Sequence, residues 1–254
     1  MTGFRPDHAG AEVRTSPNFG PRRDGKSPTI LLLHYTGMET GEAAESWLCN
    51  PESDVSCHYL VHEDGRIVQM VRECDRAWHA GKAWWAGETD INSVSIGIEI
   101  VNPGHAGGLP DYPPRQIDAV IALASDIMQR NAIAASNVLA HSDVAPGRKC
   151  DPGEKFPWSR LAAEGIAVHV PPAPLEDGGM LKPGDEGKAV EQLQSMLALV
   201  GYGVDINGTF DDRTRACVAA FQRRYRPCRV DGLADASTIR TMQALMERLP
   251  QAFV

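Results

Sequence analysis

Two histidines and one aspartate stand where a metal ion could be held. His34 directly follows the apolar run 29–33 (TILLL), and His141 directly follows residues 137–140 (NVLA). Asp151 lies ten residues after His141 and precedes a Pro-Gly pair, which is typical of a tight turn. Two imidazoles and one carboxylate can bind zinc in three positions and leave the fourth open to water, as catalytic zinc sites do.

Spacing by itself does not select these three ligands. A histidine at the end of a strand is more often structural than metal-binding, so a short motif of this kind is a hypothesis. A thiolate beside Asp151 would also bind zinc well. The competing ligands are His58, His62, His79, His105 and Cys150. On the residues alone, the third ligand is either Asp151 or Cys150.

A predicted strand over 94–101 carries a further candidate group. Its apolar residues occupy every second position, so they face one side of the strand. Glu99 then faces the other side, next to Gly97, which leaves room beside it. The runs 29–33 and 137–140 are also predicted strands. Because strand ends converge at one edge of a sheet, we expect His34 and His141 to lie together.

The remaining pattern mixes strands with helices, which favours an α/β domain with a central mixed β-sheet flanked by helices. A short helix is expected over 42–48. Two apolar runs around Asp64-Gly65 are typical of a hairpin. A long helix begins at Pro113-Pro114 and buries one apolar face. Residues 1–28 show little periodicity, and we interpret them as an irregular lead-in.

A proline- and glycine-rich stretch over 171–179 is the clearest boundary in the sequence. It separates a first domain, 1–170, from a small three-helix domain, 180–254. Within the latter, 206–214 and 230–238 each contain a glycine turn and an aspartate that can cap the next helix, at a constant offset of 24. This repeat indicates two packed turn-and-helix units without a chemical role.

Composition excludes some classes of function. Of the 254 residues, 43% are hydrophobic, which is enough for a buried core, and the net charge is −8. An acidic chain is a poor general binder of nucleic acid, because phosphates attract clustered Lys and Arg. No run approaches the ~20 apolar residues of a transmembrane segment. The oligomeric state cannot be read from this pattern. One basic cluster is interpreted as a solvated helix face: Arg223, Arg224, Arg226 and Arg229.

The six cysteines form no CxxC pair and are too sparse for a disulfide scaffold. We expect mostly reduced thiols that are buried or half-buried, as free cysteines usually are. A bridge between Cys49 and Cys57 is the alternative.

Five motifs carry a resemblance to a known family. In order, they are TILLLHYT, SCHYLV, RAWHAG, NSVSIGIEIVN and HSDVAPGRKCDPG. Over residues 26–168 the chain resembles the zinc-dependent N-acetylmuramoyl-L-alanine amidases, which are related to phage amidases and animal peptidoglycan-recognition proteins. The C-terminal part, with its repeat and the sequence AFQRRY, resembles the three-helix peptidoglycan-binding module often joined to such enzymes.

The resemblance implies a ligand set and a mechanism. His34, His141 and Asp151 hold one Zn²⁺. The resemblance favours Asp151 over Cys150 as the third ligand, because the family's lysine stands two residues before that ligand, as Lys149 stands before Asp151. A zinc-bound water is the nucleophile, Glu99 is the general base and acid, and Lys149 stabilises the oxyanion. Many relatives have a tyrosine where this chain has Cys57, which leaves the acid/base role to Glu99.

The implied reaction is hydrolysis of the amide between N-acetylmuramic acid and L-alanine, in peptidoglycan or in (anhydro-)muropeptides. His79, His58 and Arg148 are candidates for substrate contact, with packed structural roles as the alternative for the two histidines. Two other functions fit the same residues: a non-catalytic peptidoglycan-recognition protein, and a zinc peptidase that cuts stem peptides.

The two halves of the sequence predict different locations. A peptidoglycan-binding module favours the cell envelope or periplasm, where the polymeric wall lies. The N-terminus has no visible signal peptide, which favours the cytoplasm. We expect the cell envelope, with the cytoplasm as the alternative.

Overall fold

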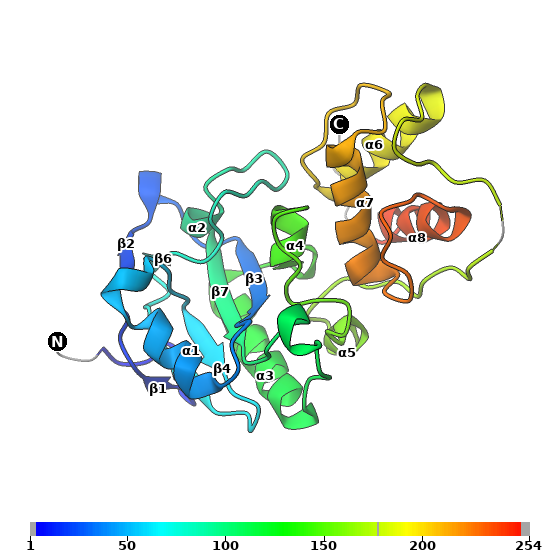
Figure 1. The fold of residues 1–254 in the computed structure, drawn as a ribbon. Helices are drawn as coiled ribbons and strands as arrows, with labels where there is room; N and C mark the ends of the chain where they lie inside the picture. The colour runs from blue at the N-terminus through cyan, green and yellow to red at the C-terminus, as the bar shows by residue number, and fades with distance from the viewer. Residues whose placement is uncertain (1–3, 177, 250–254) are drawn as a thin grey trace.

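A computed structural model describes residues 4–176 and 178–249, and its main feature there is a six-stranded mixed sheet (Figure 1). All neighbouring strands are parallel except β4 and β5, which form the predicted hairpin. In spatial order the strands are β1 (Glu12–Val13), β5 (Ile67–Gln69), β4 (Tyr59–Val61), β7 (Ser95–Ile100), β3 (Ile30–Tyr35) and β8 (Val138–Ala140).

The central strands β3 and β7 are apolar because helices or loops cover both faces of the sheet. Helix α3 (Pro114–Asn131) covers one face, where its Ile117 and Val120 pack against alternate residues of β3 and β7. Helix α1 (Gly41–Leu48) packs over β4 and β5. The predicted α/β class, the hairpin and these helices are therefore confirmed.

Shorter helical elements connect the layers. The α-helical segments are α2 (Ile91–Val94), α4 (His141–Val144) and α5 (Trp158–Ala163). The 3₁₀ segments are η1 (Arg23–Gly25), η2 (Pro51–Ser53), η3 (His105–Gly107) and η4 (Ala135–Asn137). None of the helices in the described ranges is long and apolar enough to cross a membrane.

The prediction of an irregular lead-in over 1–28 is wrong for part of that range. Strand β1 adds to the main sheet beside β5, and β2 (Phe19–Pro21) pairs with β6 (Asp75–Ala77) in a separate two-stranded sheet. Strands of two or three residues are too short to show an alternating pattern in the sequence. Residues 1–3 of the predicted lead-in lie outside the described residues.

The C-terminal region contains the three predicted helices, α6 (Lys188–Val200), α7 (Asp212–Tyr225) and α8 (Ala236–Met246). Asp211 and Asp235 cap α7 and α8 by accepting the backbone N–H three residues on, at 2.7 Å in both cases. The repeat is therefore visible in the fold as well as in the sequence. The last residues of the predicted domain, 250–254, lie outside the described residues.

The interpretation of the arginine cluster as a solvated helix face is wrong for two of its members. Arg224 and Arg226 are buried, and each pairs with a buried carboxylate, Asp143 and Asp235 respectively. The six cysteines are free thiols, so the alternative bridge between Cys49 and Cys57 is absent; Cys74 and Cys228 are exposed.

Candidate active site

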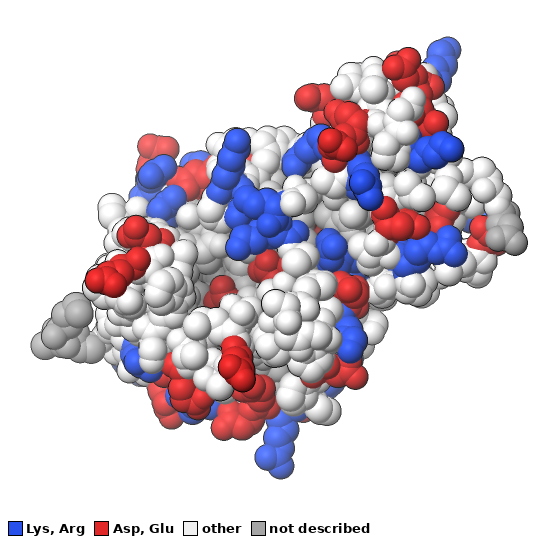
Figure 2. Space-filling model, in the orientation of Figure 1, with Lys and Arg blue, Asp and Glu red and all other residues white. Residues whose placement is uncertain are grey.

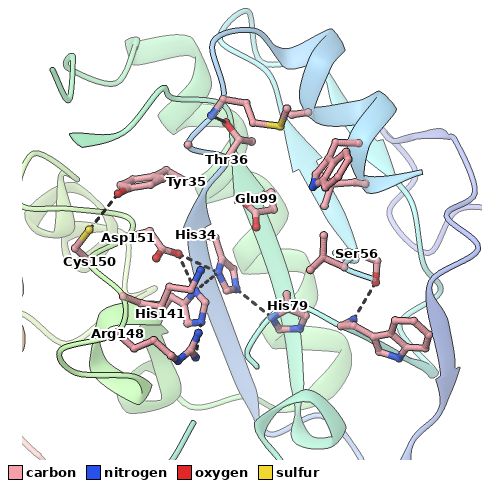
Figure 3. A pocket seen from close by; sticks show the side chains of 18 residues that line it. His34, Tyr35, Thr36, Ser56, His79, Glu99, His141, Arg148, Cys150 and Asp151 are labelled. Atoms are coloured by element: carbon pink, nitrogen blue, oxygen red, sulfur yellow. Dashed lines mark hydrogen bonds and ion pairs between the residues drawn. The ribbon is translucent and has the colours of Figure 1, made fainter. Parts of the chain in front are cut away.

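The fold brings two histidines and one aspartate to one edge of the sheet. His34 lies near the end of β3, and His141 begins α4 directly after β8, which is the parallel neighbour of β3. Asp151 returns to the same place because its carbonyl accepts the N–H of Ser142. Figure 3 shows the three side chains pointing toward one another.

The three donor atoms have the spacing of a metal site. His34 Nδ1 lies 2.9 Å from His141 Nδ1 and 3.1 Å from Asp151 Oδ2, and His141 Nδ1 lies 2.9 Å from the same oxygen. Ligands of a tetrahedral zinc ion, at about 2.0–2.1 Å from the metal, stand roughly 3.3 Å apart. The set therefore fits zinc in both chemistry and size, and it is the one such cluster of three in the described part of the chain.

Burial and mutual charge set the protonation of these groups. Burial, with help from His141, lowers the pKa of His34 to about 4. Burial alone would raise the pKa of Asp151, but His141 and His34 more than offset it and hold that pKa below its usual range. At neutral pH, His34 is a neutral imidazole and Asp151 a carboxylate, which are the forms that bind metal.

Residues 79 and 80 contact the Nε2 atoms of His34 and His141, which face away from the metal position. His34 Nε2 lies 3.0 Å from His79 Nδ1, and the Nε2 of His141 donates to the carbonyl of Ala80 at 3.0 Å. Both ligand rings therefore present Nδ1 to the metal position, because the other nitrogen is engaged. The motif RAWHAG thus supplies these partners, which spacing could not identify.

Asn92 holds this supporting segment and was missed by sequence reasoning. Its side-chain oxygen accepts the backbone N–H groups of His79 and Ala80, at 3.1 and 2.8 Å. Gly97 gives the His79 ring its space, since a Cβ at this position would stand 2.6 Å from the ring. The sequence does not indicate this contact. Helix α2 is only four residues long, which is too short to show a periodic pattern that would assign Asn92 to a face.

Glu99 lies in β7 directly beside His34 in the register of β3. The residue is half-buried, but its Oε2 is buried and has no hydrogen-bond partner among the described residues. Burial, reinforced by the charge of Asp151, raises the pKa of Glu99 well above its usual value, and Lys149 acts in the opposite direction. A carboxyl group with a raised pKa and a free oxygen is suited to exchanging protons.

These groups line a cavity of about 360 Å³. Figure 2 shows the corresponding face hollowed, with Lys and Arg gathered along one side of the hollow. Several lining residues were not predicted from the sequence. One of them is Trp47, whose side chain is exposed, so the spacing of buried residues along its helix does not point to it. The lining includes His34, Tyr35, Thr36, Trp47, Ser56, Trp78, His79, Glu99, His141, Arg148, Lys149, Cys150 and Asp151.

The structure separates the remaining candidates. Lys149 and Arg148 line the cavity, and the Arg148 guanidinium donates to the carbonyls of Ala80 and Lys82. Cys150 also reaches the cavity, but its Sγ lies 3.1 Å from the Tyr35 hydroxyl, away from the three donors (Figure 3). This geometry favours Asp151 over Cys150 as the third ligand.

His58 is not brought to the cavity. It is fully buried, and its Nδ1 accepts the backbone N–H of Gly97 at 2.9 Å. Its Nε2 lies 3.2 Å from the carbonyl of Asp75 and 3.3 Å from Arg22. This placement fits the structural alternative for His58 and gives no support to substrate contact.

Comparison with known proteins gives two family matches. Residues 24–154 match the N-acetylmuramoyl-L-alanine amidase model, and residues 186–242 match that of a peptidoglycan binding domain. The chain is 35% identical to the N-acetylmuramoyl-L-alanine amidase AmiD of Escherichia coli, over 87% of this chain and 83% of that one.

Solved structures agree with this similarity along nearly the whole chain. The complex of E. coli AmiD with anhydro-N-acetylmuramic acid-L-Ala-D-γ-Glu-L-Lys has a TM-score of 0.74 at 36% identity and covers 94% of each chain. AmpDH3 from Pseudomonas aeruginosa has a TM-score of 0.73 at 32% identity and covers 93% of this chain and 96% of its own. The chain therefore belongs to the N-acetylmuramoyl-L-alanine amidase family, as its five motifs predicted.

Proposed function

We propose that this protein is a zinc-dependent hydrolase of the amide between N-acetylmuramic acid and L-alanine, in peptidoglycan or in anhydro-muropeptides. The observation that carries the proposal is the buried Oε2 of Glu99, which has no hydrogen-bond partner among the described residues, in a residue that lies in register with His34. A binding protein has no need for a buried carboxyl oxygen without a hydrogen-bond partner, whereas a hydrolase needs a proton acceptor there.

His34, His141 and Asp151 would hold the zinc ion. When bound, zinc acts as a Lewis acid that makes water acidic near neutral pH and polarises a carbonyl. Asp151 keeps its negative charge because both histidines hold its pKa down. His79 and Ala80 fix the orientation of the two imidazoles.

Two further side chains have chemical roles in this proposal. Glu99 accepts a proton from the attacking water and delivers it to the leaving amine of L-alanine. Its raised pKa makes it a stronger proton acceptor than an ordinary carboxylate. Lys149, on the cavity wall, places positive charge near the developing oxyanion. Arg148 and His79 line the same cavity and are proposed to contact substrate.

The substrate class is supported by the relatives. AmiD and AmpDH3 are described as bound to anhydro-muramic peptides. The match to a peptidoglycan binding domain over 186–242 supports a polymeric substrate as well. We propose that 1–170 is the catalytic domain, 180–254 the binding domain and 171–179 the linker, and that the protein acts in the cell envelope; cell fractionation with an antibody tests the location.

The test is digestion of intact sacculi and of soluble anhydro-muropeptide, with and without a zinc chelator, followed by mass analysis. Release of intact stem peptides that begin at L-alanine, abolished by chelator and restored by zinc, is expected. Shortened stems would instead identify a peptidase, and wall binding without any product would identify a recognition protein. Activity that survives complete zinc removal would overturn the metal assignment.

A further inference from the structure

Asp143 holds the short helix that carries His141. Helix α4 spans only His141–Val144, and Asp143 Oδ2 accepts the N–H of Ala140 at 2.9 Å. This bond closes the turn between β8 and α4, which is where the chain presents the His141 ring. Asp143 is 1% exposed, so its carboxylate depends on partners inside the protein.

Those partners come from the C-terminal region. The hydroxyl of Tyr202 donates to Asp143 Oδ1 at 2.9 Å, and Arg224 Nη1 donates to Asp143 Oδ2 at 2.6 Å. Tyr202 follows α6 and Arg224 lies in α7, which faces α4 in Figure 1. Both carboxylate oxygens near His141 are thus held from the other region of the chain.

Arg224 is anchored more widely than one ion pair requires. Its Nη2 donates to the carbonyl of Val138 in β8 at 2.9 Å, and its guanidinium carbon lies 4.0 Å from the ring centre of Trp158. One buried cation therefore fixes β8, α4 and α5 relative to α7. Removing either member of a buried pair leaves an uncompensated buried charge, so loss of this contact is strongly destabilising.

We infer that Tyr202 and Arg224 are positioning residues for the metal ligand His141, acting through Asp143. The region that matches a peptidoglycan binding domain is then also a structural part of the metal site. The inference rests on the proposed zinc role of His141. It predicts that damage to this contact weakens zinc binding and turnover even on a small soluble substrate that the C-terminal region has no need to capture.

The test compares Tyr202→Phe and Arg224→Met with the wild type in the full chain. Zinc affinity is measured by competition with a chromophoric chelator, and kcat and KM are measured on soluble anhydro-muropeptide at saturating zinc. Each variant is expected to bind zinc about 10-fold or more weakly, within the range known for groups that orient metal ligands. We expect kcat to fall with KM little changed.

Two matched controls separate positioning from stability. Tyr59→Phe removes another buried hydroxyl that donates to a carboxylate, Glu73 at 2.6 Å, and Tyr59 packs in the cluster with α3. Arg226→Met removes another buried arginine of the C-terminal region, paired with Asp235. Both controls should lower the melting temperature and leave zinc affinity unchanged.

The outcomes distinguish this inference from the proposed function. Unchanged zinc affinity in a folded Tyr202→Phe protein would overturn the inference alone, and this variant decides the matter if Arg224→Met does not fold. A wild-type protein that binds no zinc would overturn the proposed function and the inference together. Equal loss of affinity in the controls would also overturn the inference, because stability alone would then explain the effect.

Discussion

Glu99 is expected to be required for turnover and also to lower the stability of the metal-free protein. The Glu99→Gln change keeps the shape of the group but removes its ability to take a proton. Turnover should fall by about 10²–10⁴, the usual contribution of a general base, with zinc affinity maintained. Kinetics on anhydro-muropeptide check this result, and a near wild-type rate would remove Glu99 from the mechanism.

The same substitution should stabilise the metal-free protein near neutral pH. Because the pKa of Glu99 is raised in the fold, the unfolded chain releases this proton first, and rising pH favours unfolding. Glutamine carries no such penalty. The melting temperature of Glu99→Gln should exceed that of the wild type at pH 7. The difference should shrink as the pH falls through the unfolded pKa of about 4.3 and vanish well below it, where the carboxyl is neutral in both states.

The third ligand can be tested by a pair of adjacent substitutions. Asp151→Ala removes one of the three clustered donors and should abolish stoichiometric zinc binding. Cys150→Ser should bind one zinc per chain with wild-type affinity, because the Cys150 thiol points to Tyr35. Elemental analysis after dialysis measures both, and retained zinc in Asp151→Ala would contradict the assignment.

These two residues also mark a limit of sequence reasoning. Spacing left Asp151 and Cys150 equal, because both lie in the same turn and both residue types bind zinc. The choice depends on side-chain direction, which changes between neighbours in a turn and follows no simple period. Glu99 was easier to place, since alternation along a strand assigns each side chain to a face.

At the scale of elements, β7 positions two parts of the site at once. Glu99 faces the cavity, and Gly97 leaves space for His79, which supports His34. Alternation predicted that Glu99 and Gly97 lie on the same face of the strand. It could not predict what fills the space, because His79 arrives from a loop with no periodic pattern.

Gly97→Ala should therefore damage the metal site from a distance. The added methyl would meet the His79 ring, so the ring must move and the support of His34 is lost. We expect zinc affinity to fall about 10–100-fold and stability to fall by about 1–3 kcal/mol. Gly20→Ala is the control, because this strand glycine has open space around its Cβ position. Wild-type affinity in Gly97→Ala would exclude a role for His79.

At the scale of the whole molecule, the arginine cluster explains why the association of the two regions was not predicted. Arginines near the end of an acidic chain normally face solvent. Arg224 can be buried because Asp143, 81 positions earlier, supplies the opposite charge. Such a pair leaves no local signal in the sequence. The repeat in the same region was predictable, because both caps depend on residues a few positions apart.

The two regions also share an apolar core, which leads to a prediction about unfolding. One buried cluster contains Leu32 and Leu139 from the sheet together with Leu193 and Tyr202 from the C-terminal region. Burial of this kind couples the regions, so thermal unfolding should occur in a single transition. Zinc at about 100 times its dissociation constant adds roughly 2.7 kcal/mol, which corresponds to roughly 5–10 °C for a chain of this size.

Hydrogen exchange with mass spectrometry can identify which elements zinc stabilises. Chelation should increase exchange in α6, α7 and α8 as well as in β3 and β8, because the coupled core transmits the loss of the metal to helices that contribute none of the three donors. In Asp151→Ala, chelator should change nothing in either region. A response confined to the sheet, or a second transition that ignores zinc, would show that the C-terminal helices unfold independently of the catalytic region.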